Sequence, residues 1–160
     1  MSNRLKFRKY LVLAACFLIM AVSFSIINNI TSLFIDPVTK HLRLSISSFS
    51  FVFTIGAITT ALMSPVIGQL ISKVPLKAIM SLGAILAGGG FFCYSLATEI
   101  WMFYVIAVIV GIGTSCLTVI PISTAITHWF EDKKGMALGI AMAGAGTGSF
   151  IWMQIVSRML

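Results

Sequence analysis

Charged side chains are scarce in this chain of 160 residues, since only 9% are Asp, Glu, Lys or Arg and only four residues are acidic. Soluble globular domains carry charge on about a quarter of their residues. Hydrophobic residues make up 59% of the chain, and its mean hydropathy is +1.06. This balance excludes a soluble globular protein and indicates an integral membrane protein, whose first partner is the lipid bilayer.

Cysteine and histidine are also few. The three cysteines, Cys16, Cys93 and Cys116, lie inside apolar runs, and no Cys-x-x-Cys pair occurs. A thiol in such a place behaves as a small hydrophobe, so neither a disulfide framework nor a metal site is predicted. No nucleophile and base occur together in an active-site pattern. The sequence therefore predicts no enzyme, no metal and no cofactor.

The eleven basic residues give a formal charge of +7, but they lie in the short gaps between apolar runs. They are therefore orientation signals and do not form a nucleic-acid-binding face. With a cytoplasmic N-terminus, the inner segments hold eight of them, Arg4, Lys6, Arg8, Lys9, Lys73, Lys77, Lys133 and Lys134, and the outer segments hold three, Lys40, Arg43 and Arg158. This excess favours a cytoplasmic N-terminus in a multi-pass protein of the cell (plasma or inner) membrane.

Five apolar runs are long enough to cross a bilayer as helices. They cover residues 10–35, 46–71, 76–97, 100–127 and 135–157. The first run is too long for a cleaved signal peptide, and too few apolar residues precede Cys16 for a lipoprotein signal. We therefore expect an all-α, polytopic membrane helix bundle of about five transmembrane helices.

The fifth run opens with small residues at regular spacing. It follows Trp129-Phe130 and a charged turn, and its stripe consists of Gly135 and Gly139, a run that Ala143 completes, and of Gly144 and Gly148. Small residues let helix backbones approach closely in lipid, where tight packing drives association. Two interpretations stay open, a static packing contact or a contact that also slides during a functional cycle. Nucleotide binding is excluded, because no strand precedes the run and Ser149 replaces the third glycine of the dinucleotide fingerprint.

Polar residues in the first run also share one helix face. Ser25, Asn28, Asn29 and Ser32 stand at relative positions 0, 3, 4 and 7. An unpaired amide in hydrocarbon is costly, so this face must meet protein or water. Helix-to-helix hydrogen bonding and the lining of a cavity are both consistent with this pattern.

Three stretches carry a family resemblance. They are Trp129-Phe130 with the charged turn and Gly135-x-Ala137-x-Gly139-Ile140-Ala141-x-Ala143-Gly144-x-Gly146-x-Gly148; Phe34-Ile35-x-Pro37-Val38 with Leu42-x-Leu44-Ser45 and Ser48-Phe49-Ser50; and Gly68-x-Leu70 with Lys73 and Lys77. Together they resemble the N-terminal half of a major facilitator superfamily transporter, nearest to the monocarboxylate and oxalate/formate porter branch. The first stretch, which resembles the fourth-to-fifth helix signature of that branch, is the most specific.

The third stretch departs from the superfamily's loop motif, Gly-x-Leu-x-Asp-basic-x-Gly-basic-basic. Ser72 stands in place of the aspartate, Pro75 in place of the glycine and Leu76 in place of a basic residue. In the family that aspartate helps to latch the two halves together, so the resemblance does not imply this latch here. The basic residue that some branches carry in helix four is also absent, and Ala107 occupies its place by spacing.

The resemblance implies a secondary transporter that moves a small solute, with organic anions such as monocarboxylates as the first candidates, by alternating access between two helical bundles. The residues expected to line the solute cavity are Asn28, Asn29, Thr114 and Thr118, with Thr54, Met142 and Gln154 as weaker candidates. The residues expected in helix packing and gating are Gly135, Gly139, Gly144, Gly148, Gly68, Lys73 and Lys77. Histidine is the side-chain type that can switch charge near neutral pH, and His128 lies beside an apolar run, where an interfacial position without a coupling role explains it best.

The alternative is a truncated, non-transporting membrane protein or subunit that needs a partner. Five helices cannot enclose a cavity between two bundles, so the missing C-terminal half or another membrane chain would have to complete it. About seven further apolar spans in the reading frame after Leu160, with a longer cytoplasmic linker after the sixth, would identify a clipped transporter.

Overall fold

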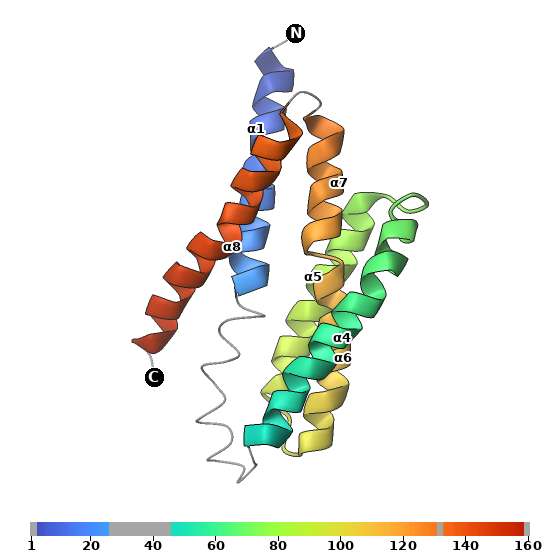
Figure 1. Cartoon of the computed structure of the whole chain (residues 1–160), viewed down its shortest axis with the longest axis vertical. Coiled ribbons are helices and arrows are strands. Elements are labelled where there is room, and N and C mark those ends of the chain that lie inside the picture. Colours follow the sequence, from blue (N-terminus) through green and yellow to red (C-terminus); the bar gives the residue numbers. More distant parts are fainter. Residues whose placement is uncertain (1–2, 26–45, 131–132, 159–160) are drawn as a thin grey trace. The chain divides into compact units, whose positions relative to one another are not determined.

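The computed structural model of this chain describes residues 3–25, 46–130 and 133–158. Within these ranges all regular structure is helical (Figure 1). In chain order the helices are α1 (Asn3–Ile19), the π-helical turn η1 (Met20–Phe24), α4 (Ile46–Leu70), α5 (Leu76–Tyr94), α6 (Ile100–Ser115), α7 (Val119–Trp129) and α8 (Lys134–Ser157).

Four stretches of the described chain are long and apolar enough to cross a membrane: Ser50–Leu70, Leu76–Tyr94, Ile100–Trp129 and Lys134–Ser157. The predicted fold class, an all-α membrane helix bundle, is thereby confirmed. The predicted first span, residues 10–35, continues beyond the described residues. The number of five spans and their exact limits therefore stay predictions.

The third of these stretches is interrupted between α6 and α7. Pro121 has no backbone N–H to donate to the carbonyl of Leu117, and its ring crowds that carbonyl, so a regular helix cannot pass. A tightened turn closes α6, with the Leu117 N–H donating to the Thr114 carbonyl at 2.9 Å, and α7 restarts from Thr118. In α4 the helix instead continues through Pro65 to Leu70.

The chain divides into two compact units, and the division falls at this interruption, between Leu117 and Thr118. One unit contains α1, η1, α7 and α8, and the other contains α4, α5 and α6. Each unit thus combines a part of the interrupted stretch with helices that lie elsewhere in the sequence.

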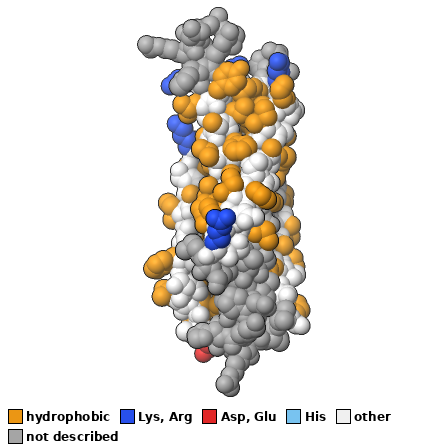
Figure 2. Space-filling view, turned by 90° about the vertical axis from the view of Figure 1, so that its left-hand side faces the viewer, with side chains coloured by type: hydrophobic (Ala, Val, Ile, Leu, Met, Phe, Trp, Pro, Cys, Tyr) orange, Lys and Arg blue, Asp and Glu red, His pale blue; other side chains and the backbone are white. Residues whose placement is uncertain are grey.

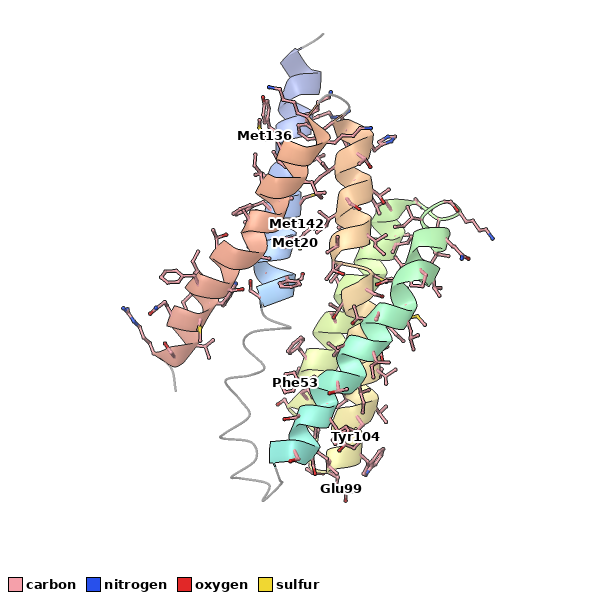
Figure 3. All side chains as sticks on the ribbon, viewed as in Figure 1. Met20, Phe53, Glu99, Tyr104, Met136 and Met142 are labelled. Carbon is pink, nitrogen blue, oxygen red and sulfur yellow. The ribbon has the colours of Figure 1, made fainter. Side chains whose placement is uncertain are left out.

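In the unit of α4, α5 and α6, the central element is α6, which packs against both other helices. One apolar cluster consists of Val52, Phe103 and Ala107, and a second consists of Ile67, Ile79 and Cys116. Beside the first cluster, the Tyr104 hydroxyl donates a hydrogen bond to the Ser48 carbonyl at 3.1 Å (Figure 3). The two clusters and this bond fix α6 to its neighbours along its length.

In the unit of α1, η1, α7 and α8, α8 packs mainly along α1 and η1, and α7 contacts both α1 and α8. The buried side chains include Cys16 and Met20 from the first segment, Ile122 and Ile126 from α7, and Ala141 from α8. The side chains of α8 at this interface are small, so the helix backbones, and not large side chains, form its contact.

Large apolar side chains remain on the surface of every candidate span, as Figure 2 shows for one face of the molecule. On α4 they include Phe51, Ile58, Leu62 and Val66, and on α5 they include Ile85. Lipid tails are as apolar as these side chains, so such exposure is normal for a membrane-spanning helix.

Candidate functional site

A close backbone contact joins the first segment to α8 at the α1–α8 seam, which we define as Phe17 of α1 and Ala21 of η1 against Gly144 and Gly148. A β-carbon added at Gly144 would overlap the carbonyl oxygen of Phe17, and one added at Gly148 would overlap that of Ala21. One Cα hydrogen of each glycine therefore points at a carbonyl oxygen of the other helix, the geometry of a weak C–H···O hydrogen bond. Only glycine fits at these two positions.

Two hydroxyls close the seam at the end of the π-helical turn. The Ser25 Oγ donates to the Ala145 carbonyl at 3.1 Å, and the Ser149 Oγ donates to the same carbonyl at 2.6 Å. The two hydroxyl oxygens lie 3.3 Å apart. Ser25 is 0% exposed, so its hydroxyl is fully withdrawn from lipid and water and depends on this partner.

The predicted glycine stripe divides between two faces of α8. Its buried face consists of Ala137, Ala141, Gly144 and Gly148, which follow the helical spacing i, i+4, i+7 and i+11. Gly135 and Gly139 are exposed and have no atom within 4 Å of an added β-carbon. The step from Gly139 to Gly144 is five residues, or about 140° around a helix of 3.6 residues per turn, which explains why the stripe does not stay on one face. The gating role of all four glycines stays a prediction.

Glycines also form the close contacts of α6. An added β-carbon at Gly113 would lie 2.6 Å from the Ala87 nitrogen and 3.0 Å from the Gly83 carbonyl oxygen, both on α5. On the opposite side, a β-carbon at Gly111 would lie 2.9 Å from the Gly56 carbonyl oxygen of α4. The helix is therefore held between two backbones.

A hydroxyl strengthens the contact between α4 and α6. The Thr60 Oγ1 lies 2.9 Å from the Gly56 carbonyl of its own helix and 3.1 Å from the Gly111 carbonyl of α6. Its proton can thus be shared between two carbonyls, one on each helix. Interhelical hydrogen bonds of this kind stabilise membrane bundles modestly.

The predicted cavity residues of the first span, Asn28 and Asn29, lie outside the described residues. Thr114 is buried and donates to the Val110 carbonyl at 2.6 Å, whereas Thr118 is half-buried at the interruption before α7. Thr54 is exposed and donates to the Ser50 carbonyl of its own helix at 3.3 Å. Their contact with a solute stays a prediction.

The remaining cavity candidates belong to α8. Met142 is 37% exposed at the middle of the helix (Figure 3), and Gln154 is exposed near its end. The Ser157 hydroxyl donates to the Gln154 carbonyl, which leaves the Gln154 side chain amide out of that bond. Both side chains are thus accessible on the surface of their own unit.

The loop residues predicted for gating follow α4. Gly68 is exposed with open space around it, and Lys73 and Lys77 are exposed at the turn into α5. The turn closes through backbone hydrogen bonds from Lys73 and Val74 to the Leu70 carbonyl, at 3.0 Å and 2.9 Å. A second exposed group, His128, lies at the end of α7 with its ring edge-to-face on Trp129.

Charge is absent from the interior of the candidate spans. Within the four described spans the only Lys, Arg, Asp or Glu residues are Lys77 and Lys134, each in the first two residues of its helix. The described residues also hold no group of three or more His, Cys, Asp or Glu that could bind a metal ion. The interior of these spans therefore carries uncharged side chains, among them hydroxyls and the Gln154 amide.

Sequence reasoning missed two features of this region. The interruption after α6 follows from Pro121, whose effect on the preceding turn is a signal that the sequence does contain. The π-helical turn at Met20–Phe24 has no such signal, because its residues are ordinary apolar helix formers apart from Ser23. In the structure this π-helical turn packs against α8.

The comparisons with known proteins agree on one family. The family model described as Major Facilitator Superfamily matches residues 11–157. The chain is 27% identical over 152 residues to monocarboxylate transporter 12 of Mus musculus, and 26% identical over 151 residues to the oxalate:formate antiporter of Oxalobacter formigenes. It is 29% identical over 148 residues to an uncharacterized MFS-type transporter, YcxA, of Bacillus subtilis.

These matches extend over nearly all of this chain but over a part of each relative. They cover 94%, 94% and 92% of the chain, and 31%, 35% and 36% of the respective relatives. The chain thus spans about a third of the length of the curated relatives it matches. No solved structure matches it.

Proposed function

The chain belongs to the Major Facilitator Superfamily, and from this premise we propose that it forms the N-terminal part of a secondary transporter that moves a small solute by alternating access. The observation that carries the proposal is similarity along almost the whole chain to two transporters of small carboxylates by name. The family makes this a membrane transport protein and not an enzyme. The identity of the solute and the alternating-access mechanism are what we propose.

Organic anions, monocarboxylates among them, are the solute class that we propose. The names of the relatives support this class. The described spans supply no deep cation to neutralise an anion. We therefore propose that a cation from outside these spans pairs with the carboxylate.

The α1–α8 seam supports a cycle in which helices move against each other. Its contacts are glycine hydrogens on carbonyl oxygens, and such contacts are weak. Few side chains interlock there, so the two backbones can shift at small cost. In this proposal Gly144 and Gly148 form the contact that moves, while Gly135, Gly139, Gly68, Lys73 and Lys77 act at surfaces toward the rest of the transporter.

Exchange in liposomes tests the function. The protein is produced from its reading frame with whatever that frame encodes after Leu160, and in parallel as residues 1–160 alone. We expect the first to exchange labelled formate, oxalate or lactate across the membrane, and the second to do so at less than about a tenth of that rate. An absence of exchange for all three anions by the first protein would reject the solute class.

The orientation is part of the proposal. We infer a cytoplasmic N-terminus in the cell membrane from the excess of basic residues in the inner segments. Cysteines introduced at Lys73 and at Thr98, one at a time in a Cys93→Ser background, report the side of the membrane on which each turn lies. A membrane-impermeant thiol reagent added to intact cells should label Thr98→Cys and spare Lys73→Cys. The opposite pattern would reverse the orientation.

A second candidate function is that of a non-transporting membrane subunit that requires another chain. The observation in its favour is the exposure of α4 and α5, in whose 18-residue apolar segments only 11% and 22% of the residues are buried. Gly88 and Gly89 on α5 have no neighbour within 4 Å of an added β-carbon, so another helix can approach there. A stable complex of defined mass with a second membrane chain, together with no solute exchange, would favour this function.

A further inference from the structure

The π-helical turn η1 lies where the first segment makes its tightest contact with α8. It occupies Met20–Phe24, directly between α1 and Ser25. A π-helical turn is rare, and it most often marks one residue inserted into an α-helix at a functional position. Its hydrogen bonds are spread over a wider ring, so it persists only where contacts with other helices support it.

Those supporting contacts are present on both sides of the turn. Ala21, inside it, presents its carbonyl oxygen to Gly148, and Ser25, which follows it, donates to the Ala145 carbonyl at 3.1 Å. Ser149 holds the same carbonyl from its own helix. The α8 segment 144–149 thus contacts the turn through two backbone carbonyls and a pair of hydroxyls.

The Val22 side chain, inside the turn, contributes little to packing. Val22 is 43% exposed, whereas the neighbouring Met20 and Ser25 are 2% and 0% exposed. Removal of one residue from a π-helical turn restores an α-helix and keeps both flanking segments on their original faces. An α-helical form of Met20–Phe24 would likewise leave the contacts before the turn in place.

We propose that η1 is a two-register joint, held in its wide register by α8 through Ala21 and Ser25. When Ser25 leaves the Ala145 carbonyl, the turn tightens to an α-helix, and Ser25 rotates about the helix axis away from α8. The role of this motion in solute transport rests on the function proposed above. The joint itself does not depend on that function, because only residues of this chain form it.

Deletion of Val22 tests the two registers. The deleted chain and the unchanged full chain are placed in lipid nanodiscs, and amide hydrogen exchange is followed over residues 17–25. We expect the deleted chain to fold and to exchange these amides at least about tenfold more slowly, because the weak turn has become an α-helix. Equal exchange rates in the two chains would overturn the proposal.

A matched deletion in α8 tests whether the chain tolerates the loss of any exposed helical residue. Ile140 is 44% exposed in α8, close to the exposure of Val22, but it lies in a regular α-helix. Its deletion turns every later residue by about 100° and moves Gly144 and Gly148 off the seam. We expect this chain to aggregate or to lose protection over residues 17–25. If the two deletions damage the chain equally, η1 is not a removable insertion and the joint is wrong.

Substitution of the hydroxyls tests what holds the joint. Ser25→Ala should slow exchange over the turn by about three- to tenfold, toward the rate of the Val22 deletion, because the turn is no longer held open by the Ala145 carbonyl and tightens to an α-helix. Ser157→Ala, which removes only a bond to the Gln154 carbonyl at the end of α8, should leave that exchange unchanged. An unchanged rate in Ser25→Ala would overturn the role of Ser25. These readings are taken without solute, so a failure of the joint is distinguishable from a failure to transport.

Discussion

The α1–α8 seam and the packing of α6 use glycine for the same purpose but with different surroundings. At the seam, Gly144 and Gly148 face one backbone, that of the first segment, and the remaining sides of α8 are largely exposed. In the other unit, Gly113 and Gly111 place α6 between α5 and α4, so a backbone lies on each side. Close glycine contacts thus confine α8 on one side and α6 on two sides, so a sideways shift is more hindered for α6.

The difference is also visible in the side chains. Around α6, Tyr94 stacks on Phe103 with ring centroids 5.6 Å apart, and Thr60 bridges to the Gly111 carbonyl. The seam instead relies on hydroxyls at Ser25 and Ser149.

Two native cysteines can report the opening of each unit separately, because Cys16 lies in one unit and Cys116 in the other and they are only 3% and 2% exposed. Their labelling rate with a thiol reagent measures how often each unit opens.

The largest effect is expected at α6. Gly113→Ala places a methyl group 2.6 Å from the Ala87 nitrogen, and α6 cannot retreat because α4 lies behind it. We expect unfolding of this unit to become easier by about 2–3 kcal/mol. Labelling of Cys116, in a Cys16→Ala, Cys93→Ser background, should accelerate by more than about tenfold.

Gly88→Ala, on the exposed side of α5, is the control for this substitution. An added methyl group meets nothing within 4 Å there, and alanine favours helix over glycine by about 0.5–1 kcal/mol. Labelling of Cys116 should therefore stay the same or become slower. If Gly113→Ala behaves like Gly88→Ala, α6 is not confined as described.

A smaller loss is expected at the seam. Gly148→Ala introduces a methyl group that overlaps the Ala21 carbonyl, but the first segment can move away from α8 to accommodate it. We expect a cost of about 1–2 kcal/mol and faster labelling of Cys16 in a Cys93→Ser, Cys116→Ala background. Gly146→Ala, in open space on the same helix, should not accelerate labelling. A larger cost at Gly148 than at Gly113 would reverse the comparison.

The bridging hydroxyl of α4 should matter less than either glycine. Thr60→Val keeps the shape of the side chain and removes the hydrogen bond to the Gly111 carbonyl. Its loss should cost about 1 kcal/mol, which accelerates Cys116 labelling by about fivefold. Thr54→Val, whose hydroxyl bonds only within its own helix, should change the rate by less than twofold or so. Equal effects would mean that the bridge to α6 contributes nothing.

The smallest effect is expected at the end of the same unit. Tyr104→Phe removes the hydrogen bond to the Ser48 carbonyl and leaves the ring in place against its apolar cluster. The unfolding free energy should fall by about 0.5 kcal/mol, measured as before through Cys116. A loss above about 2 kcal/mol would show that this bond anchors the start of α4 to α6.

Some of the candidate site followed from residue type and spacing, and some did not. Gly144 and Gly148 were singled out as close-packing positions, and both lie in the seam, whereas Gly135 and Gly139 of the same spacing are exposed. Spacing alone cannot choose between the faces of α8, because small residues occur on both. Ala137 and Ala141, which complete the buried face, carried no signal that separated them from the exposed alanines.

The sequence by itself determined the membrane environment, the helical class and the family, because these depend on the length and polarity of each run and on motifs within single segments. The tertiary structure alone decided which glycines meet a neighbour, where Ser25 finds its acceptor and where the first segment adopts a π-helical turn. Each of these depends on which backbone lies within a few ångströms, and in a uniformly apolar chain polarity does not specify that neighbour.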